Sequence, residues 1–292
     1  MVVKNNLTAM NSNRMLNATV VSQAKSTEKL SSGYKINRAA DDAAGLAISE
    51  KMRRQIRGLT QATANAQDGI SCLQTAEGAL NEVHAMLQRM NELAIKAGNE
   101  TLQSIDKRYI QSELTALRVE IDRVAETTTF NEQKLLNGEF SIGKRIQVGA
   151  EVQTPNQIRI TIVTMNWASI TAASVSAFGV PVSAGGGAGA STLRVDTTNY
   201  DDIRATVSVI KAALQAVSTQ RSDMGAVQNR LEHTVANLKN VVENTTAAES
   251  QIRDTDMALE MVRFSNNNIL AQAGQAMLAQ ANQANQGVLA LL

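Results

Sequence analysis

Residues 56–97 read IRGLTQATANAQDGISCLQTAEGALNEVHAMLQRMNELAIKA. Apolar or small side chains recur along this stretch in alternating steps of three and four, which is the period of a coiled-coil helix. After Leu73 the pattern slips by one residue, as in a stammer, where a superhelix is locally overwound. A helix this long cannot bury its stripe alone, so it needs long partners. The stripe comprises Ile56, Leu59, Thr63, Ala66, Ile70, Leu73, Ala76, Leu80, Val83, Leu87, Met90, Ala94 and Ala97.

Four other segments repeat this period, more weakly at the N-terminus than elsewhere. Asp41-Asp42 supplies N-caps before the long helix, and Gly98-Asn99 supplies a stop after it. Arg221 interrupts the longest of the other stripes. The stripes run through Val3, Leu7, Met10, Val21 and Ala24; through Ile110, Leu114, Leu117, Ile121 and Val124; from Ile203 to Ile252; and through Leu270, Ala273, Met277, Ala281, Ala284, Val288 and Leu291.

The period changes to two between residues 137 and 165. Residues 145–148 and 157–162 alternate polar and apolar side chains, and Asn137-Gly138 supplies a turn. These features predict a small β-hairpin. Residues 166–199 contain Trp167 and a glycine-rich run, which favour an irregular loop. The expected fold is mainly α: a long antiparallel coiled-coil bundle folded back on itself, with a β-hairpin mid-chain.

Composition excludes several classes of function. The 292 residues carry a formal net charge of +1, which gives no electrostatic case for nucleic acid or for an anionic membrane surface. Aromatic residues make up 3%, too few for an ordinary globular core. No apolar run reaches the ~20 residues of a membrane span. The start of the chain lacks the apolar core of a cleavable signal, which predicts cytoplasmic residence or another export route. Cys72, the sole cysteine, lies on a stripe and is expected to be buried and inert.

The two ends of the chain are nearly uncharged. Residues 264–292 contain no Asp, Glu, Lys or Arg, and Lys4 is the one charged residue among the first thirteen. Short isolated helices are marginal in water, and two weak stripes bury little area between them. An intramolecular hairpin is the alternative, but the pattern favours packing against copies of the chain. The residues expected to mediate self-assembly are Leu7, Met10, Val21, Leu270, Met277, Val288 and Leu291.

Long motifs in both halves of the chain resemble those of bacterial flagellins. The N-terminal half contains LSSGYKIN at 30–37, ADDAAGLAI at 40–48, GLTQA at 58–62, NAQDGIS at 65–71 and QTAEGAL at 74–80. The C-terminal half contains GAVQNR at 225–230, IRDTDMA at 252–258 and QAGQAMLAQANQ at 272–283. The resemblance covers about residues 1–165 and 200–292.

The resemblance implies a subunit of the flagellar filament, a helical homo-polymer outside the cell that drives swimming. Residues 1–40 and 254–292 would pair in an inner tube, and residues 41–165 and 200–253 would form an outer tube with the hairpin. The segment 166–199 would replace the variable outer domain of other flagellins. Export would use the flagellar type III apparatus, with an export chaperone and a filament cap as partners.

The resemblance also implies recognition by Toll-like receptor 5. Residues 87–95, LQRMNELAI, are similar to the flagellin segment that this receptor binds. Carried over residue by residue, Gln88, Arg89, Leu93 and, on the next helix, Glu113 would face the receptor. The alternative is that Arg89 and Glu113 are assembly contacts only.

Other functions remain as alternatives. A hook–filament junction protein, or another axial protein of the flagellum, shares helical ends of this kind. A cytoplasmic coiled-coil scaffold would carry more charge at its ends. The sequence offers no set of acid, base, nucleophile or metal ligands for an enzyme, and it predicts no cofactor. His84 and His233 have no second ligand at helical spacing, so no metal site is expected.

Overall fold

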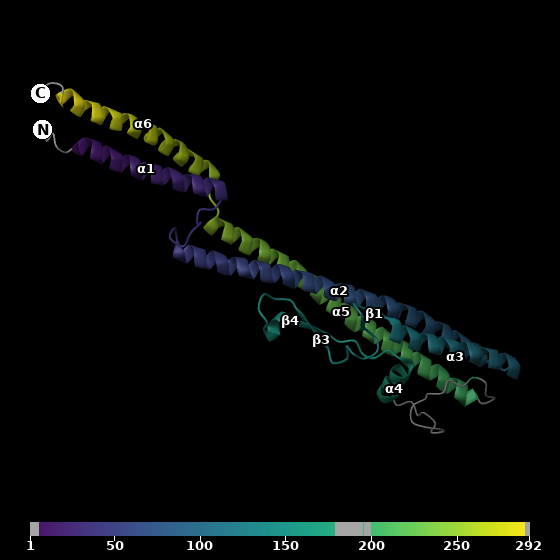
Figure 1. The fold of residues 1–292 in the computed structure, drawn as a ribbon. Helices are drawn as coiled ribbons and strands as arrows, with labels where there is room; N and C mark the ends of the chain where they lie inside the picture. Colours follow the sequence, from purple (N-terminus) through teal and green to yellow (C-terminus); the bar gives the residue numbers. More distant parts are fainter. Residues whose placement is uncertain (1–5, 179–194, 196–199, 290–292) are drawn as a thin grey trace. The chain divides into compact units, whose positions relative to one another are not determined.

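The computed structural model describes residues 6–178, 195 and 200–289. Long helices dominate this part of the chain, and the strands are short (Figure 1). This confirms the predicted fold class. The elements are α1 (Leu7–Ser32), α2 (Ala43–Ala97), α3 (Ser104–Thr127), β1 (Thr129–Phe130), β2 (Gln133–Lys134), β3 (Lys144–Gln147), the 3₁₀ turn η1 (Thr154–Asn156), β4 (Gln157–Ile160), α4 (Trp167–Phe178), α5 (Tyr200–Arg253) and α6 (Met257–Leu289).

The chain forms two compact units. Unit 1 comprises Met1–Arg57 and Val241–Leu292, and unit 2 comprises Gly58–Asn240. Helices α2 and α5 each contribute residues to both units. The domain boundaries predicted from the sequence, at 40/41 and 253/254, differ from these unit boundaries and lie between helices. They were predicted for the inner and outer tubes of an assembled filament, and that division stays a prediction.

Unit 1 pairs the two terminal helices, α1 and α6, side by side and antiparallel (Figure 1). Near the chain ends, Asn6 Nδ2 donates to the Ala281 carbonyl oxygen at 3.1 Å. A Cβ built at Gly274 would come within 3.2 Å of the Leu16 side chain. The backbones therefore approach closely at this point, which is possible because residue 274 has no side chain.

The core of unit 2 buries the predicted stripes. In α2, residues on both sides of the slip are buried, from Leu59 and Ala66 through Leu73 and Ala76 to Ala97. Helix α5 runs antiparallel to this part of α2: a Cβ at Gly69 would contact Leu231, and one at Gly98 would contact Ile203. The remaining core comes from Ile110, Leu114 and Ile121 of α3 and from Ile203, Ile210, Val217, Met224 and Leu231 of α5.

The slip in α2 lies opposite the interruption in α5. Glu77 follows the slip, and its carboxylate pairs with the Arg221 guanidinium at 3.6 Å. The neighbouring Gln220, which is buried, donates through Nε2 to the Thr161 carbonyl oxygen at 3.3 Å. Polar side chains therefore occupy the place where both apolar stripes break, and the Glu77–Arg221 pair links the two helices there.

The predicted β-hairpin forms within residues 137–165. Strands β3 and β4 are antiparallel, with Lys144 opposite Ile160 and Gln147 opposite Gln157. Ile158 and Ile160 point into the core, as the alternation predicts.

Strands β1 and β2 form a second, shorter hairpin that the sequence analysis missed. Asn131 and Glu132 at its tip have φ of 49° and 65°. Two residues with positive φ make the tight turn that matches strand twist. Glycine usually signals such a turn, and neither position has one.

The predicted loop over 166–199 is wrong for its first part, because Trp167–Phe178 forms helix α4. The Asp122 carboxylate of α3 accepts a hydrogen bond from the Trp167 backbone N–H at 2.8 Å. Trp167 and Ile170 are buried in the core. Tertiary contacts with α3 and the core thus stabilise a helix whose sequence has no charged residue to mark it. Residues 179–194 and 196–199 of the predicted loop lie outside the described residues.

Two further expectations concern the core and the membrane. Cys72 is buried, as predicted, and burial raises the pKa of its thiol. Within the described ranges, no helix combines the length and apolar character needed to cross a bilayer.

Candidate self-assembly surfaces

Helix α1 turns mainly small and polar side chains toward α6 and leaves most of its larger apolar side chains exposed. Ala9, Ser12 and Thr19 are half-buried, and Ser26 is buried. The predicted assembly residues lie on the other faces: Leu7 and Met10 are each 66% exposed and Val21 is 59% exposed. The stripe predicted from α1 is therefore not used within the chain.

Helix α6 shows the same arrangement. Its less exposed residues include Glu260, Phe264, Ala271, Gly274 and Leu278, whereas the predicted assembly residues Leu270 and Met277 are 57% and 62% exposed. The side chain of Val288 and all of Leu291 lie outside the described residues. The centre of this face, Ala271 and Gly274, escaped the sequence analysis because such small residues give little apolar signal, although they allow the closest helix approach.

The exposed apolar side chains have energetic consequences. Full burial of one Leu, Met or Val side chain stabilises by about 1.5–3 kcal/mol. Monomeric proteins rarely leave large contiguous apolar patches in water. The α1–α6 pair has several such side chains on each helix, and the exposed stretch of α6 from residue 264 has no charge to solvate it. Within the chain, these side chains therefore lack the burial that the core of unit 2 gives to its apolar residues.

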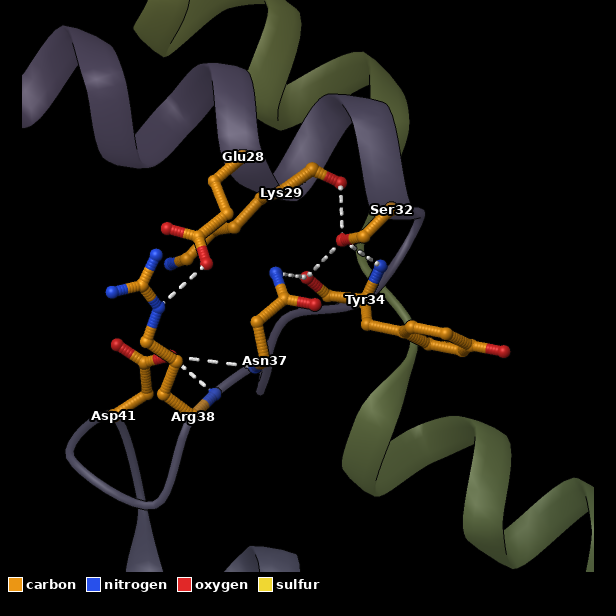
Figure 2. A network of polar contacts seen from close by, with 7 residues as sticks. All are labelled: Glu28, Lys29, Ser32, Tyr34, Asn37, Arg38 and Asp41. Carbon is orange, nitrogen blue, oxygen red and sulfur yellow. Dashed lines mark hydrogen bonds and ion pairs between the residues drawn. The ribbon is translucent and has the colours of Figure 1, made fainter.

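Between α1 and α2 the chain makes a loop held by polar contacts (Figure 2). Gly33 ends α1 with φ +76°, and its N–H donates to the Lys29 carbonyl oxygen at 2.9 Å. The Asp41 carboxylate accepts from the backbone N–H groups of Arg38 at 3.0 Å and Asn37 at 3.3 Å. The Arg38 hydrogen bond, and then that of Asn37, holds the pKa of Asp41 below its usual range. The next residue, Asp42, caps α2 as predicted, accepting from Gly45 N at 2.9 Å.

This loop is joined to the short linker between α5 and α6. Lys35 N donates to the Arg253 carbonyl oxygen at 2.6 Å, and Thr255 N donates to the Gly33 carbonyl oxygen at 2.9 Å. Tyr34 and Asp254 form the β-bridge between these two contacts. We call this pairing of residues 33–35 with 253–255 the linker joint. It ties together two segments about 220 residues apart in sequence.

The Arg253 side chain contacts one residue of the linker joint and one residue outside it. Its guanidinium lies 4.6 Å from the centre of the Tyr34 ring, and its Nη1 is 2.9 Å from Glu50 Oε1 of α2. The hydrogen bond from Arg253 lowers the pKa of Glu50. Sequence reasoning found both linkers as motifs, but no periodic signal shows that two loops pair, so their contact was missed.

The residues carried over to a receptor surface lie on α2 and α3. Arg89 donates to Glu113 Oε1 through Nη2 at 2.9 Å and through Nε at 3.1 Å, and these hydrogen bonds raise the pKa of Arg89. Gln88 Nε2 lies 3.0 Å from His84 Nε2. Leu93 departs from the prediction: it is 3% exposed and packs in the core, so it cannot itself contact a partner at this surface.

Comparison with known proteins decides the family. The sequence matches the bacterial flagellin N-terminal helical region over residues 3–141 and the bacterial flagellin C-terminal helical region over residues 207–292. The chain belongs to the bacterial flagellin family. A flagellin of Halalkalibacterium halodurans is 49% identical over 292 residues, and one of Bacillus subtilis is 46% identical over 313 residues. Each alignment covers 100% of both chains.

A solved structure shares the fold. It is titled as a putative flagellar hook-associated protein from Vibrio parahaemolyticus, and it superposes with a TM-score of 0.57 at 14% sequence identity. The superposition covers 73% of this chain and 100% of that chain. The flagellin relatives are structural proteins. Among the residues that the structure describes, no three His, Cys, Asp or Glu side chains are grouped so that they could hold a metal ion.

Proposed function

We propose that the chain is a structural subunit that self-assembles into the bacterial flagellar filament outside the cell and so serves swimming motility. One observation carries the proposal: α1 and α6 bury mainly small and polar residues against each other and leave Leu7, Met10, Leu270 and Met277 exposed. Full-length similarity to flagellins supports the same conclusion.

Filament growth would complete the core that the α1–α6 pair lacks. In a helical polymer, one surface of a subunit meets a different surface of the next, so contacts repeat without closing. Apolar side chains on the outward faces of both helices can meet several neighbours at once. A closed dimer would cover only one face, whereas the exposed residues occupy more than one.

The runner-up is a hook–filament junction protein or another axial protein of the flagellum. The fold shared with a putative hook-associated protein fits this alternative, but that likeness concerns the fold alone. The two functions differ in the length of the product: a filament subunit elongates without limit, whereas a junction protein stops after a short segment.

The test is seeded polymerisation of the purified chain, followed by negative-stain microscopy. We expect long tubes from the wild-type chain and none from Met277→Asp, because a charge would be buried at each contact. Met277→Leu is the matched control and should still elongate, since it keeps an apolar side chain of similar size. Long tubes from Met277→Asp would refute this assembly surface, and short capped segments from the wild-type chain would favour the junction protein.

Before assembly, the exposed apolar faces need protection. The proposed partners are a flagellar export chaperone in the cytoplasm and a filament cap at the growing end, with export through the flagellar type III apparatus. A chaperone that covers α6 should slow amide hydrogen exchange there, because binding would suppress the local opening that exchange requires. Unchanged exchange along α6 in the purified complex would contradict this route.

We also propose that the free subunit is bound by Toll-like receptor 5 through Gln88, Arg89 and Glu113. The Arg89–Glu113 pair supports this, because it presents an exposed, preorganised charge pair across α2 and α3. Leu93 would shape this surface from beneath. In receptor-activation assays with monomer, Arg89→Asp should signal less than wild type, whereas Arg14→Asp, at an exposed position on α1, should not. Equal signalling by wild type and Arg89→Asp would leave the pair with a role in assembly alone.

A further inference from the structure

The turn at Asn137-Gly138 is the single Asn-Gly dipeptide of the sequence. The fold itself requires the glycine. Gly138 has φ +103°, and a Cβ there would overlap the hydroxyl of Thr164. Only glycine adopts this backbone region readily. Glycine also leaves the backbone nitrogen of residue 138 unshielded, so that this nitrogen can approach the side chain of the preceding asparagine.

We propose that this turn is a self-modification site, at which Asn137 deamidates in the native protein. The Gly138 nitrogen attacks Asn137 Cγ and loses its proton. The Cγ–Nδ2 bond then breaks, and the nitrogen leaves as ammonia with that proton. The product is a five-membered cyclic imide. Water, the one co-reactant, opens either imide carbonyl to give aspartate or isoaspartate at position 137.

The contacts of Glu139 prepare Asn137 for this reaction. The Glu139 backbone N–H donates to Asn137 Oδ1 at 3.0 Å. A donor at this oxygen stabilises the negative charge that develops on it during the attack. The Glu139 carboxylate accepts a hydrogen bond from Asn137 Nδ2, also at 3.0 Å.

These two contacts fix both polar atoms of the side-chain amide within the turn, which replaces a conformational search with a fixed arrangement. Glu139 is thus a positioning residue. It holds the reacting amide and does not itself form or break a bond in the reaction.

Modification would disturb the fold locally. Leu136, on one side of the turn, accepts a hydrogen bond from Met165 N at 2.9 Å, and Phe140, on the other, accepts one from Ile162 N at 3.3 Å. Both side chains are buried. Isoaspartate adds one atom to the backbone between these two anchors, so one of them must shift. The new carboxylate also changes the formal net charge from +1 to 0.

The first experiment compares native and urea-unfolded full-length chain, incubated in the same mildly alkaline buffer. Trypsin releases residues 135–144 as one peptide. Its mass distinguishes asparagine from the products, and chromatographic elution with electron-transfer fragmentation distinguishes aspartate from isoaspartate. Folding normally slows deamidation, because it restricts the backbone. We expect the native chain to react at least as fast as the unfolded chain, and a slower native reaction would overturn the proposal. Asn156-Gln157, in the same unit, is the internal control and should stay unmodified.

The second experiment isolates the role of Glu139. Glu139→Ala keeps the backbone N–H and removes the carboxylate that holds Nδ2, so it should slow the native reaction several-fold and leave the unfolded reaction unchanged. Glu139→Gln keeps an acceptor oxygen and should restore most of the native rate. An unchanged native rate in Glu139→Ala would refute the positioning role. A circular dichroism melt of each variant identifies any loss of rate that comes from unfolding.

Discussion

The two compact units use one helical period in opposite ways. In unit 2, most of the larger apolar side chains of α2, α3 and α5 point inward, and Leu80, Leu87 and Leu114 are fully buried, whereas Ile95, Ile105 and Val119 are exposed. In unit 1, the helices meet through Ala271, Gly274 and Ser26, and most of the larger apolar side chains point to solvent. The period alone predicts a helix. The burial of the side chains on each face separates a core that is filled within the chain from the surface that we propose is completed by further copies.

Removal of α6 should have the largest effect. Deletion of residues 263–292 removes most of the helix that pairs with α1, together with the exposed Leu270 and Met277. We expect complete loss of seeded tube growth, measured by negative-stain microscopy and sedimentation. The thermal melt of unit 2 should persist, because its core uses none of these residues. Long tubes from the truncated chain would show that unit 1 is not the incomplete part of the molecule.

Two leucine truncations sharpen the comparison. Leu87→Ala opens a cavity in the filled core of unit 2 and should lower the free energy of unfolding of the monomer by about 2–5 kcal/mol. Leu270→Ala removes an exposed side chain and should leave monomer stability nearly unchanged while weakening polymerisation. Urea unfolding of monomers and the critical concentration for assembly measure the two effects. A similar loss of monomer stability in both variants would contradict the contrast between the units.

The sequence predicted unit 2 well because size and period agree there. Leu73 and Ala76, on the two sides of the slip, are buried as expected. The stripe residues that follow, from Leu80 to Ala97, are buried too. The β3–β4 hairpin was found because its alternation is strict and its inward residues are isoleucines. In each case, a large apolar side chain marks the face that the fold buries.

The sequence failed where contacts depend on small residues or on loops. In α6, Ala271 and Gly274 face α1, whereas the apolar pattern of the sequence runs through Leu270 and Met277, which are exposed. Asn131 adopts a positive φ in a turn that contains no glycine. Helix α4 begins with a hydrogen bond to Asp122, which is distant in sequence. The linker joint joins two loops that share no periodic pattern. Such features follow from tertiary geometry, which a local pattern does not contain.

The linker joint gives a smaller, local prediction. Arg253→Ala removes the stacking on Tyr34 and the ion pair to Glu50, and the stacking alone is worth about 1 kcal/mol. We expect faster hydrogen exchange at the amides of Lys35 and Thr255, which cross the joint, with no change in the core of unit 2. Arg253→Lys tests whether charge suffices, since lysine lacks the planar stacking surface. Unchanged exchange at both amides in Arg253→Ala would show that the backbone contacts hold the joint unaided.

The smallest expected effect is a dependence on pH confined to the same region of unit 1. The pKa values of Asp41 and Glu50 are lowered in the folded chain, by backbone hydrogen bonds from Arg38 and Asn37 in the first case and by the hydrogen bond from Arg253 in the second. A lowered pKa means that the ionised form favours the folded state, so this contribution is complete above the ordinary carboxyl pKa of about 4. This stabilising contribution is lost as the pH falls through the lower pKa values of the folded chain.

Hydrogen exchange at Lys35 and Arg38 should therefore accelerate below about pH 4, after correction for the intrinsic rate, while buried amides near Leu87 stay protected. Asp41→Asn should flatten the response at Arg38, because an amide does not titrate. A pH response of the same size in the Asp41→Asn chain would assign the effect to other carboxylates.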